Sequence, residues 1–99
     1  MDDFSRNTRM EALLNTKFTP VFLEIHDESS KHIGHGGWKE GGQTHYHIAI
    51  VSDAFEGLSR VNRQRAVNTT LAQEFETGLH ALSLKTLTPA EYEEMKFPR

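Results

Sequence analysis

The chain has 99 residues, which is enough for one domain with one hydrophobic core. Its 36% hydrophobic and 25% charged residues exclude a wholly disordered chain, and its net charge of −3 argues against a bulk nucleic-acid binder. The absence of cysteine excludes disulfides, a thiol nucleophile and thiolate metal ligands from this chain. No apolar run approaches the roughly 20 residues of a membrane span, and no secretory signal is recognised. Because zero cysteine suits a reducing compartment, we expect a cytoplasmic protein.

The first half of the chain predicts a helix and two strands, with a long loop between the strands. Apolar residues at helical spacing predict a helix over residues 8–18. Alternating side chains predict strands over 21–28 and 44–52, which would pair as an antiparallel hairpin. Between them, residues 29–43 hold five glycines and predict a flexible loop.

The second half predicts a turn over residues 53–58, a long helix over 60–76, a third strand over 80–87 and a last helix from Pro89 onward. The order αββαβα predicts an α+β fold with a three-stranded mixed sheet and helices on one face. We expect a single domain in these 99 residues, with its core over about 8–96.

Five segments, in this order along the chain, resemble the BolA family: residues 23–29 (LEIHDES), 44–46 (THY), 50–57 (IVSDAFEG), 60–65 (RVNRQR) and 80–89 (HALSLKTLTP). The resemblance covers about residues 10–95 and implies a fold similar to class II KH domains, in agreement with the predicted elements. One position departs from the family, because Gln64 stands where the family usually has histidine.

The resemblance also implies a function and its site residues. Members of this family bind monothiol glutaredoxins and share a [2Fe–2S] cluster with them, in cluster assembly, delivery or iron sensing. The histidine of the family's His-Ala-Leu motif, here His80, is a cluster ligand. A second ligand comes from the loop after the first strand, where His32 matches the family position and His35 lies close by, so either one is a candidate.

This ligand set agrees with the missing cysteines. Two imidazoles on one iron and two thiolates on the other form the Rieske pattern. A chain without cysteine supplies only the imidazoles, so the glutaredoxin cysteine and glutathione would supply the thiolates. We therefore expect the isolated chain to be a colourless monomer without a cluster, and to form a heterodimer with its partner.

A second hypothesis is DNA binding, because some bacterial family members are DNA-binding transcriptional regulators that affect cell shape and stress responses. Arg60, Arg63 and Arg65 open the long helix, and a turn and helix around residues 53–76 would present them to DNA. The same arginines would suit an acidic or glutathione-bearing partner. The negative net charge weakens the DNA hypothesis.

Two further hypotheses concern metal binding and catalysis. His45 and His47 share a strand face, with His26 expected opposite them, and nitrogen ligands in such an arrangement would suit zinc. The more favoured interpretation is a solvated sheet face. His45 also matches a recurrent position of the BolA family, and from this resemblance we expect it to make a structural hydrogen bond. No set of nucleophile, base and orienting residue stands out, so we expect no enzyme.

Overall fold

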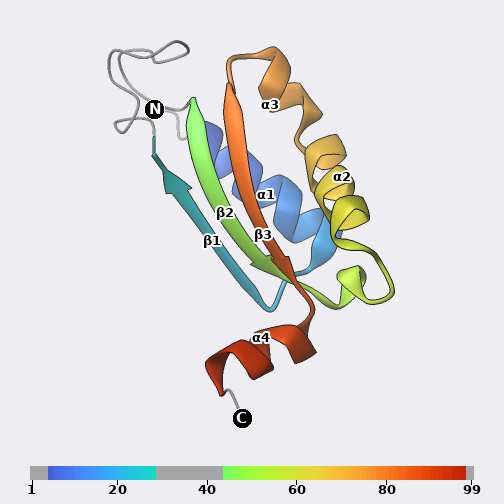
Figure 1. The fold of residues 1–99 in the computed structure, drawn as a ribbon. Helices are drawn as coiled ribbons and strands as arrows, with labels where there is room; N and C mark the ends of the chain where they lie inside the picture. Colours follow the sequence, from blue (N-terminus) through green and yellow to red (C-terminus); the bar gives the residue numbers. More distant parts are fainter. Residues whose placement is uncertain (1–4, 29–43, 98–99) are drawn as a thin grey trace.

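The computed structural model describes residues 5–28 and 44–97 and has one sheet with helices packed against it (Figure 1). The elements, in chain order, are α1 (Arg6–Phe18), β1 (Phe22–Asp27), β2 (His45–Val51), η2 (Asp53–Phe55), α2 (Arg60–Thr70), α3 (Ala72–Glu76), β3 (Ala81–Leu87) and α4 (Pro89–Lys96). This order confirms the predicted α+β fold. None of the helices in the described part of the chain is long and apolar enough to cross a membrane.

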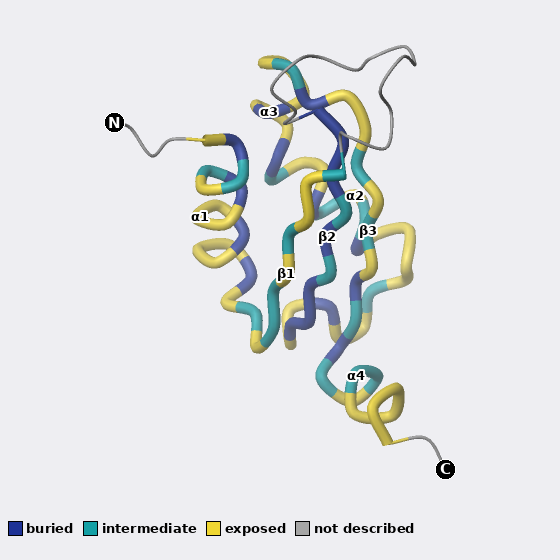
Figure 2. Tube along the Cα trace, turned by 90° about the vertical axis from the view of Figure 1, so that its left-hand side faces the viewer, coloured by how far each residue is buried: buried dark blue, intermediate teal, exposed yellow. Residues whose placement is uncertain are grey.

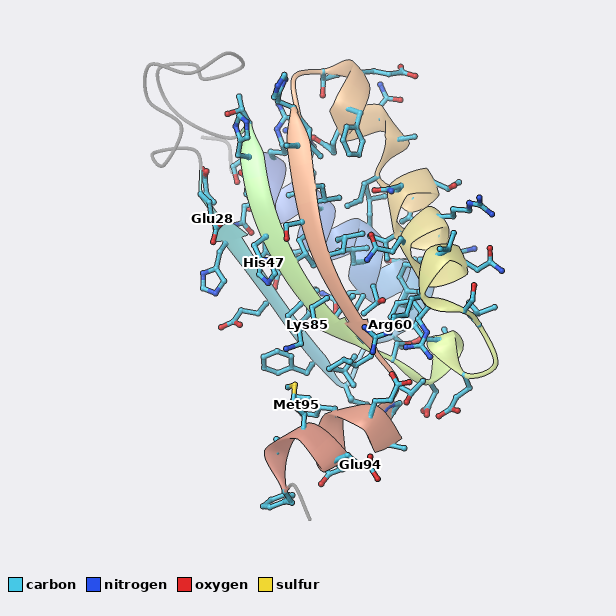
Figure 3. All side chains as sticks on the ribbon, viewed as in Figure 1. Glu28, His47, Arg60, Lys85, Glu94 and Met95 are labelled. Atoms are coloured by element: carbon cyan, nitrogen blue, oxygen red, sulfur yellow. The ribbon has the colours of Figure 1, made fainter. Side chains whose placement is uncertain are left out.

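The sheet is mixed, as the sequence predicts, with strand order β1-β2-β3. β1 runs antiparallel to β2, and β2 runs parallel to β3. The register pairs Ile25 with Ile48 and Ile48 with Leu84, so these three side chains share one face of the sheet. That face packs against α1 and α2, while His47 and Lys85 project from the opposite, open face (Figure 3).

The core lies between the helices and the sheet. Met10, Leu14 and Phe18 follow one another at four-residue spacing along α1, so all three face the sheet and are buried. Their buried neighbours are Tyr46, Ile48, Ile50, Phe55, Val67, Leu71 and Leu79. Burial of each large apolar side chain contributes about 1.5–3 kcal/mol, so this cluster is the main source of stability.

Two helix boundaries differ from the sequence prediction. α1 begins at Arg6 rather than at residue 8, because the Ser5 side chain accepts a hydrogen bond from the backbone of Thr8 and caps the helix there. The predicted helix over 60–76 is interrupted at Leu71, whose φ of −101° and ψ of 15° leave the helical range. The chain therefore forms two shorter helices, α2 and α3, instead of one.

α4 lies beyond the end of β3, on the side of the sheet away from α1 (Figure 2). Thr88 and Glu91 form a reciprocal capping box, and Pro89 occupies the first turn, as the sequence predicts. The Tyr92 ring stacks on Phe22 with 5.4 Å between the ring centroids. This contact attaches α4 to the first strand.

A buried carboxylate joins α3 to the N-terminal helix. The Glu74 side chain is 3% exposed, and its Oε1 accepts a hydrogen bond from Arg6 Nη1 at 2.6 Å. Arg9 donates to both carboxylate oxygens, each at 2.9 Å, and Arg6 also donates to Thr77. The hydrogen bonds of Arg9, followed by the charges of both arginines, hold the pKa of Glu74 below its ordinary value.

We expect Glu74→Gln to lower the free energy of unfolding by about 2–4 kcal/mol, because it leaves the buried Arg6 guanidinium without a counter-charge. The matched control is Glu76→Gln in the same helix, where the side chain is exposed and the change should stay within about 0.5 kcal/mol. Denaturant unfolding of both variants measures the difference, and equal stabilities would contradict this role for Glu74.

A second ion pair joins α2 to α4. The Arg63 side chain is 8% exposed and donates to Glu91 Oε1 at 2.7 Å and to Glu91 Oε2 at 3.2 Å. The carbonyl oxygens of Leu58 and Thr86 accept the remaining hydrogen bonds of its guanidinium, at 3.0 and 3.1 Å. These bonds from Arg63, together with the backbone N–H of Thr88, lower the pKa of Glu91 from 4.5 to about 2.

The lowered pKa of Glu91 predicts a specific loss of stability in acid. A carboxylate with a lower pKa in the folded state stabilises the fold above its unfolded pKa, and this stabilisation is lost as the pH falls from about 4.5 towards 2. Glu91→Gln keeps a side chain that can cap the helix. It should nevertheless lower the free energy of unfolding by about 1–2 kcal/mol at neutral pH, and it should make that free energy depend less on pH in acid. Chemical unfolding across this pH range, with the exposed Glu93→Gln as control, checks both effects. If the free energy of unfolding of Glu91→Gln fell with pH as steeply as that of the unsubstituted protein, Glu91 would not be the group responsible.

Candidate functional site

Two histidines lie at the end of the sheet where β1 ends and β2 and β3 begin, which we call the histidine end. His80 directly precedes β3 and is exposed. Its backbone N–H donates to the Thr44 carbonyl oxygen at 2.7 Å, and the N–H of Ala81 donates to the same oxygen at 3.1 Å. These bonds fix the His80 backbone beside the start of β2, while its side chain stays accessible.

The His80 ring packs against a second imidazole. His45 is buried, with 6% of its surface exposed, and its ring centroid lies 5.0 Å from that of His80 at an angle of 50°. The His45 Nδ1 lies 2.9 Å from Thr44 Oγ1, which is the structural hydrogen bond that the sequence predicts for His45. His45 therefore restricts the His80 ring from one side, and its own ring is held by the hydrogen bond with Thr44.

The connection from α3 to His80 is tightly determined. The backbone N–H of Leu79 donates to the Glu74 carbonyl oxygen at 2.8 Å, and the Leu79 side chain is buried in the core. Gly78 has a φ of +128°, which side-chain-bearing residues rarely adopt. The Glu74 ion pair, the glycine turn and the buried leucine together determine where His80 leaves the core.

The two loop candidates for a second ligand, His32 and His35, lie outside the described residues. The described residues on either side of these positions are Glu28 and Thr44. Glu28 lies at the histidine end (Figure 3), and Thr44 lies there too because its carbonyl oxygen accepts the hydrogen bonds of His80 and Ala81. The Glu28 N–H donates a hydrogen bond of 2.7 Å to the carbonyl oxygen of His45, the residue that follows Thr44. The described residues that precede and follow His32 and His35 in the chain therefore lie at the same end of the sheet as His80.

The three arginines of the second hypothesis divide into two groups. Arg60 and Arg65 are exposed in the first turns of α2, where a ligand can reach them. Arg63 is buried, and its guanidinium is occupied by Glu91 and two carbonyl oxygens. The structure thus gives Arg63 a different role from the expected ligand contact, because its charge is neutralised inside the fold. The neighbouring Gln64 points its amide towards the Leu84 carbonyl oxygen of the edge strand, 3.5 Å away.

The zinc hypothesis finds no support in the described part of the chain. His26 and His47 are register partners, as the sequence predicts, and lie on the open face. Each has a different neighbour, since His26 Nε2 lies 3.2 Å from Glu24 Oε2 and His47 Nδ1 lies 3.0 Å from Ser83 Oγ. Residues 5–28 and 44–97 contain no group of three or more histidine or carboxylate side chains that would hold a metal ion.

Sequence reasoning missed the Glu74 ion pair, which determines the geometry next to His80. Residue polarity favours burial of Phe75 and exposure of Glu74, yet Phe75 is 38% exposed and Glu74 is buried. One signal was available, because Arg6 and Arg9 are three residues apart and share a helix face. Two cations on one face indicate a carboxylate partner, although they do not identify it.

Comparisons with known proteins place the chain among its relatives. The family model described as BolA-like protein matches residues 14–91. SufE-like protein 1 of Arabidopsis thaliana is 44% identical over 91 residues, which cover 88% of this chain and 24% of that protein. The DNA-binding transcriptional regulator BolA of Escherichia coli is 41% identical over 88 residues, covering 89% of this chain and 80% of that protein.

Solved structures give the same result. The BolA domain of SufE1 from Arabidopsis thaliana superimposes with a TM-score of 0.81 at 43% identity, covering 91% of this chain and 99% of that domain. This chain spans only part of some full-length relatives, including 56% of Protein BOLA1 from the same plant, which is 44% identical. From the family match, the sequence identities and the shared fold together, we conclude that this chain belongs to the BolA-like protein family.

Proposed function

We propose that this protein is a non-enzymatic adaptor that binds a monothiol glutaredoxin and shares a [2Fe–2S] cluster with it. The observation that carries the proposal is His80, an exposed imidazole at the histidine end whose ring packs on the buried His45. Membership of the BolA-like family agrees with a binding or regulatory role, since relatives are named as a transcriptional regulator and as SufE-like protein 1.

The donor atoms of this chain fit one half of such a cluster. Imidazole nitrogen is an established ligand of iron in [2Fe–2S] sites, and the His80 ring is accessible while the His45 ring is buried. In this proposal His32 or His35 supplies the second nitrogen, and the glutaredoxin cysteine and glutathione supply the thiolates that this cysteine-free chain lacks. A cluster with this mixed ligation has a higher reduction potential than one with thiolates alone.

His45 has a positioning role in this proposal. Ligating histidines are commonly oriented by neighbouring groups that hold the ring in one direction. His45 is itself held by Thr44 at 2.9 Å, and its ring contacts one face of the His80 ring. This arrangement lowers the entropy that His80 loses on binding, because part of its motion is already restricted.

We expect His80→Ala to change the visible circular dichroism of a cluster reconstituted with a monothiol glutaredoxin and glutathione, or to shorten the lifetime of the cluster. Because the His80 side chain is exposed, its removal should cost less than about 1 kcal/mol of stability. The matched control is His26→Ala, which removes an exposed histidine from the open face and should leave the spectrum unchanged.

The same reconstitution tests the remaining parts of the proposal. Without a thiol donor the isolated chain should stay colourless, and single alanine substitutions of His32 and His35 should identify the loop ligand. A normal cluster spectrum from His80→Ala, with the variant folded by thermal melt, would remove His80 from the ligand set.

A second candidate function is DNA binding, favoured by the name of the Escherichia coli relative and by two exposed cations. Arg60 and Arg65 lie near the N-terminus of α2, whose free backbone N–H groups also favour phosphate. The buried Arg63 contributes nothing to this surface, so the expected contribution from phosphate contacts is smaller than three arginines would give.

The DNA candidate predicts that Arg60→Ala and Arg65→Ala each reduce the salt dependence of duplex binding by about one unit of log–log slope. Lys96→Ala, which removes an exposed cation from the last turn of α4, should leave the slope unchanged. Fluorescence anisotropy over a salt series measures all three variants. Slopes that are insensitive to both arginines would exclude the start of α2 as the DNA contact.

A further inference from the structure

The side of the molecule away from the open sheet face carries a groove between α1 and α2, with a volume of about 880 Å³. Its walls include Ala12, Leu13 and Lys17 from α1, and Arg65 and Ala66 from α2. We call this feature the α1–α2 groove. It does not include His80, and α1, which forms one of its walls, lies behind the sheet in the view of Figure 1.

Small side chains create the groove, and apolar side chains line it. Alanines at positions 12 and 66 leave space where larger residues would fill the gap between the helices. Leu13 is 38% exposed here, and Leu58 is half-buried. Apolar surface that is concentrated in a groove of this kind marks an interaction site more often than scattered exposed residues do.

The groove is positively charged although the chain is negative overall. Lys17 and Arg65 are its charged residues, and none of the described residues that line it is acidic. Neither cation forms an ion pair with another residue in the described part of the chain, and Arg65 makes only a long contact of 3.4 Å with Asn62 Oδ1. Of the other four cations on these two helices, three are paired with carboxylates: Arg6, Arg9 and Arg63.

We propose that the α1–α2 groove binds an acidic amphipathic helix of a partner protein. Apolar side chains of that helix would cover Leu13 and Leu58, while its carboxylates would pair with Lys17 and Arg65. Residues 62–70 of α2 extend for about 12 Å, which matches roughly two turns of a partner helix. This second surface is independent of the proposed cluster ligands, so both surfaces can be occupied at once.

The exposed apolar surface of the α1–α2 groove favours a helix over a nucleic acid as its occupant. A phosphate backbone would engage the two cations but would gain little from covering the exposed part of Leu13. An amphipathic helix uses both features, because its apolar stripe and its flanking charges repeat with the same spacing.

The test uses the full-length chain and a synthetic helical peptide of about 15 residues, with leucines on one face and glutamates beside them. Amide shifts should concentrate in residues 12–17 and 58–70. Lys17→Glu and Arg65→Glu should each weaken binding about threefold or more, and Leu13→Ser should weaken it as well. Lys85→Glu and Val61→Ser are the matched controls, because both residues are exposed outside the groove.

Several results would overturn this proposal. The first is that a peptide with lysines in place of the glutamates binds as tightly as the acidic peptide. The second is that Lys85→Glu weakens binding as much as Lys17→Glu and Arg65→Glu do. The third is that millimolar peptide causes no amide shifts in the groove. Shifts there with decanoate or a short DNA duplex, but not with the peptide, would assign another occupant and reject the helix. If Leu13→Ser does not fold, the two charge reversals decide the result. Normal peptide binding by His80→Ala separates this proposal from the glutaredoxin proposal.

Discussion

The buried carboxylate of Glu74 is the interaction on which the candidate site depends. Taking a carboxylate and a guanidinium out of water is costly, and the cost is offset only when the pair is well aligned and fully hydrogen-bonded. Here Arg6 and Arg9 together satisfy both carboxylate oxygens at 2.6–2.9 Å. The same residue accepts the backbone hydrogen bond of Leu79, directly before His80. An ion pair between residues 68 positions apart therefore helps to set the position of the exposed imidazole.

The Arg63–Glu91 pair has a parallel role at the opposite end of the sheet. Glu91 caps α4 through Thr88 and also binds the Arg63 guanidinium, so the start of the last helix is connected to α2. Arg63 also donates to the Thr86 carbonyl oxygen of the edge strand. Each end of the three-stranded sheet is thus held by an arginine–carboxylate contact, and the apolar core lies between them.

Much of the fold follows from local sequence patterns, whereas the long-range polar contacts do not. Alternation and caps predict the strands and the start of α4, because each of these signals acts within a few residues. Arg63 and Glu74 were not predicted to be buried, since charged residues within a helical pattern normally face solvent and their partners lie far away in sequence. The exposure of His80 agrees with its place at the start of a strand, but its contact with His45 required the register of β2 and β3. The hypothesis that His80 is a cluster ligand came from family resemblance, because a lone histidine beside a strand has no specific chemical signature.

We propose that an imidazole of this chain binds the cluster that it would share with a monothiol glutaredoxin. The most direct measurement is pulsed electron paramagnetic resonance of the reduced complex, prepared with ¹⁵N-histidine in this chain alone and natural-abundance glutaredoxin. We expect a ¹⁵N coupling to the cluster from the labelled chain, and the loss of its His80 component in His80→Ala. A complex with the same cluster spectrum but no ¹⁵N coupling would show that no imidazole of this chain binds the cluster.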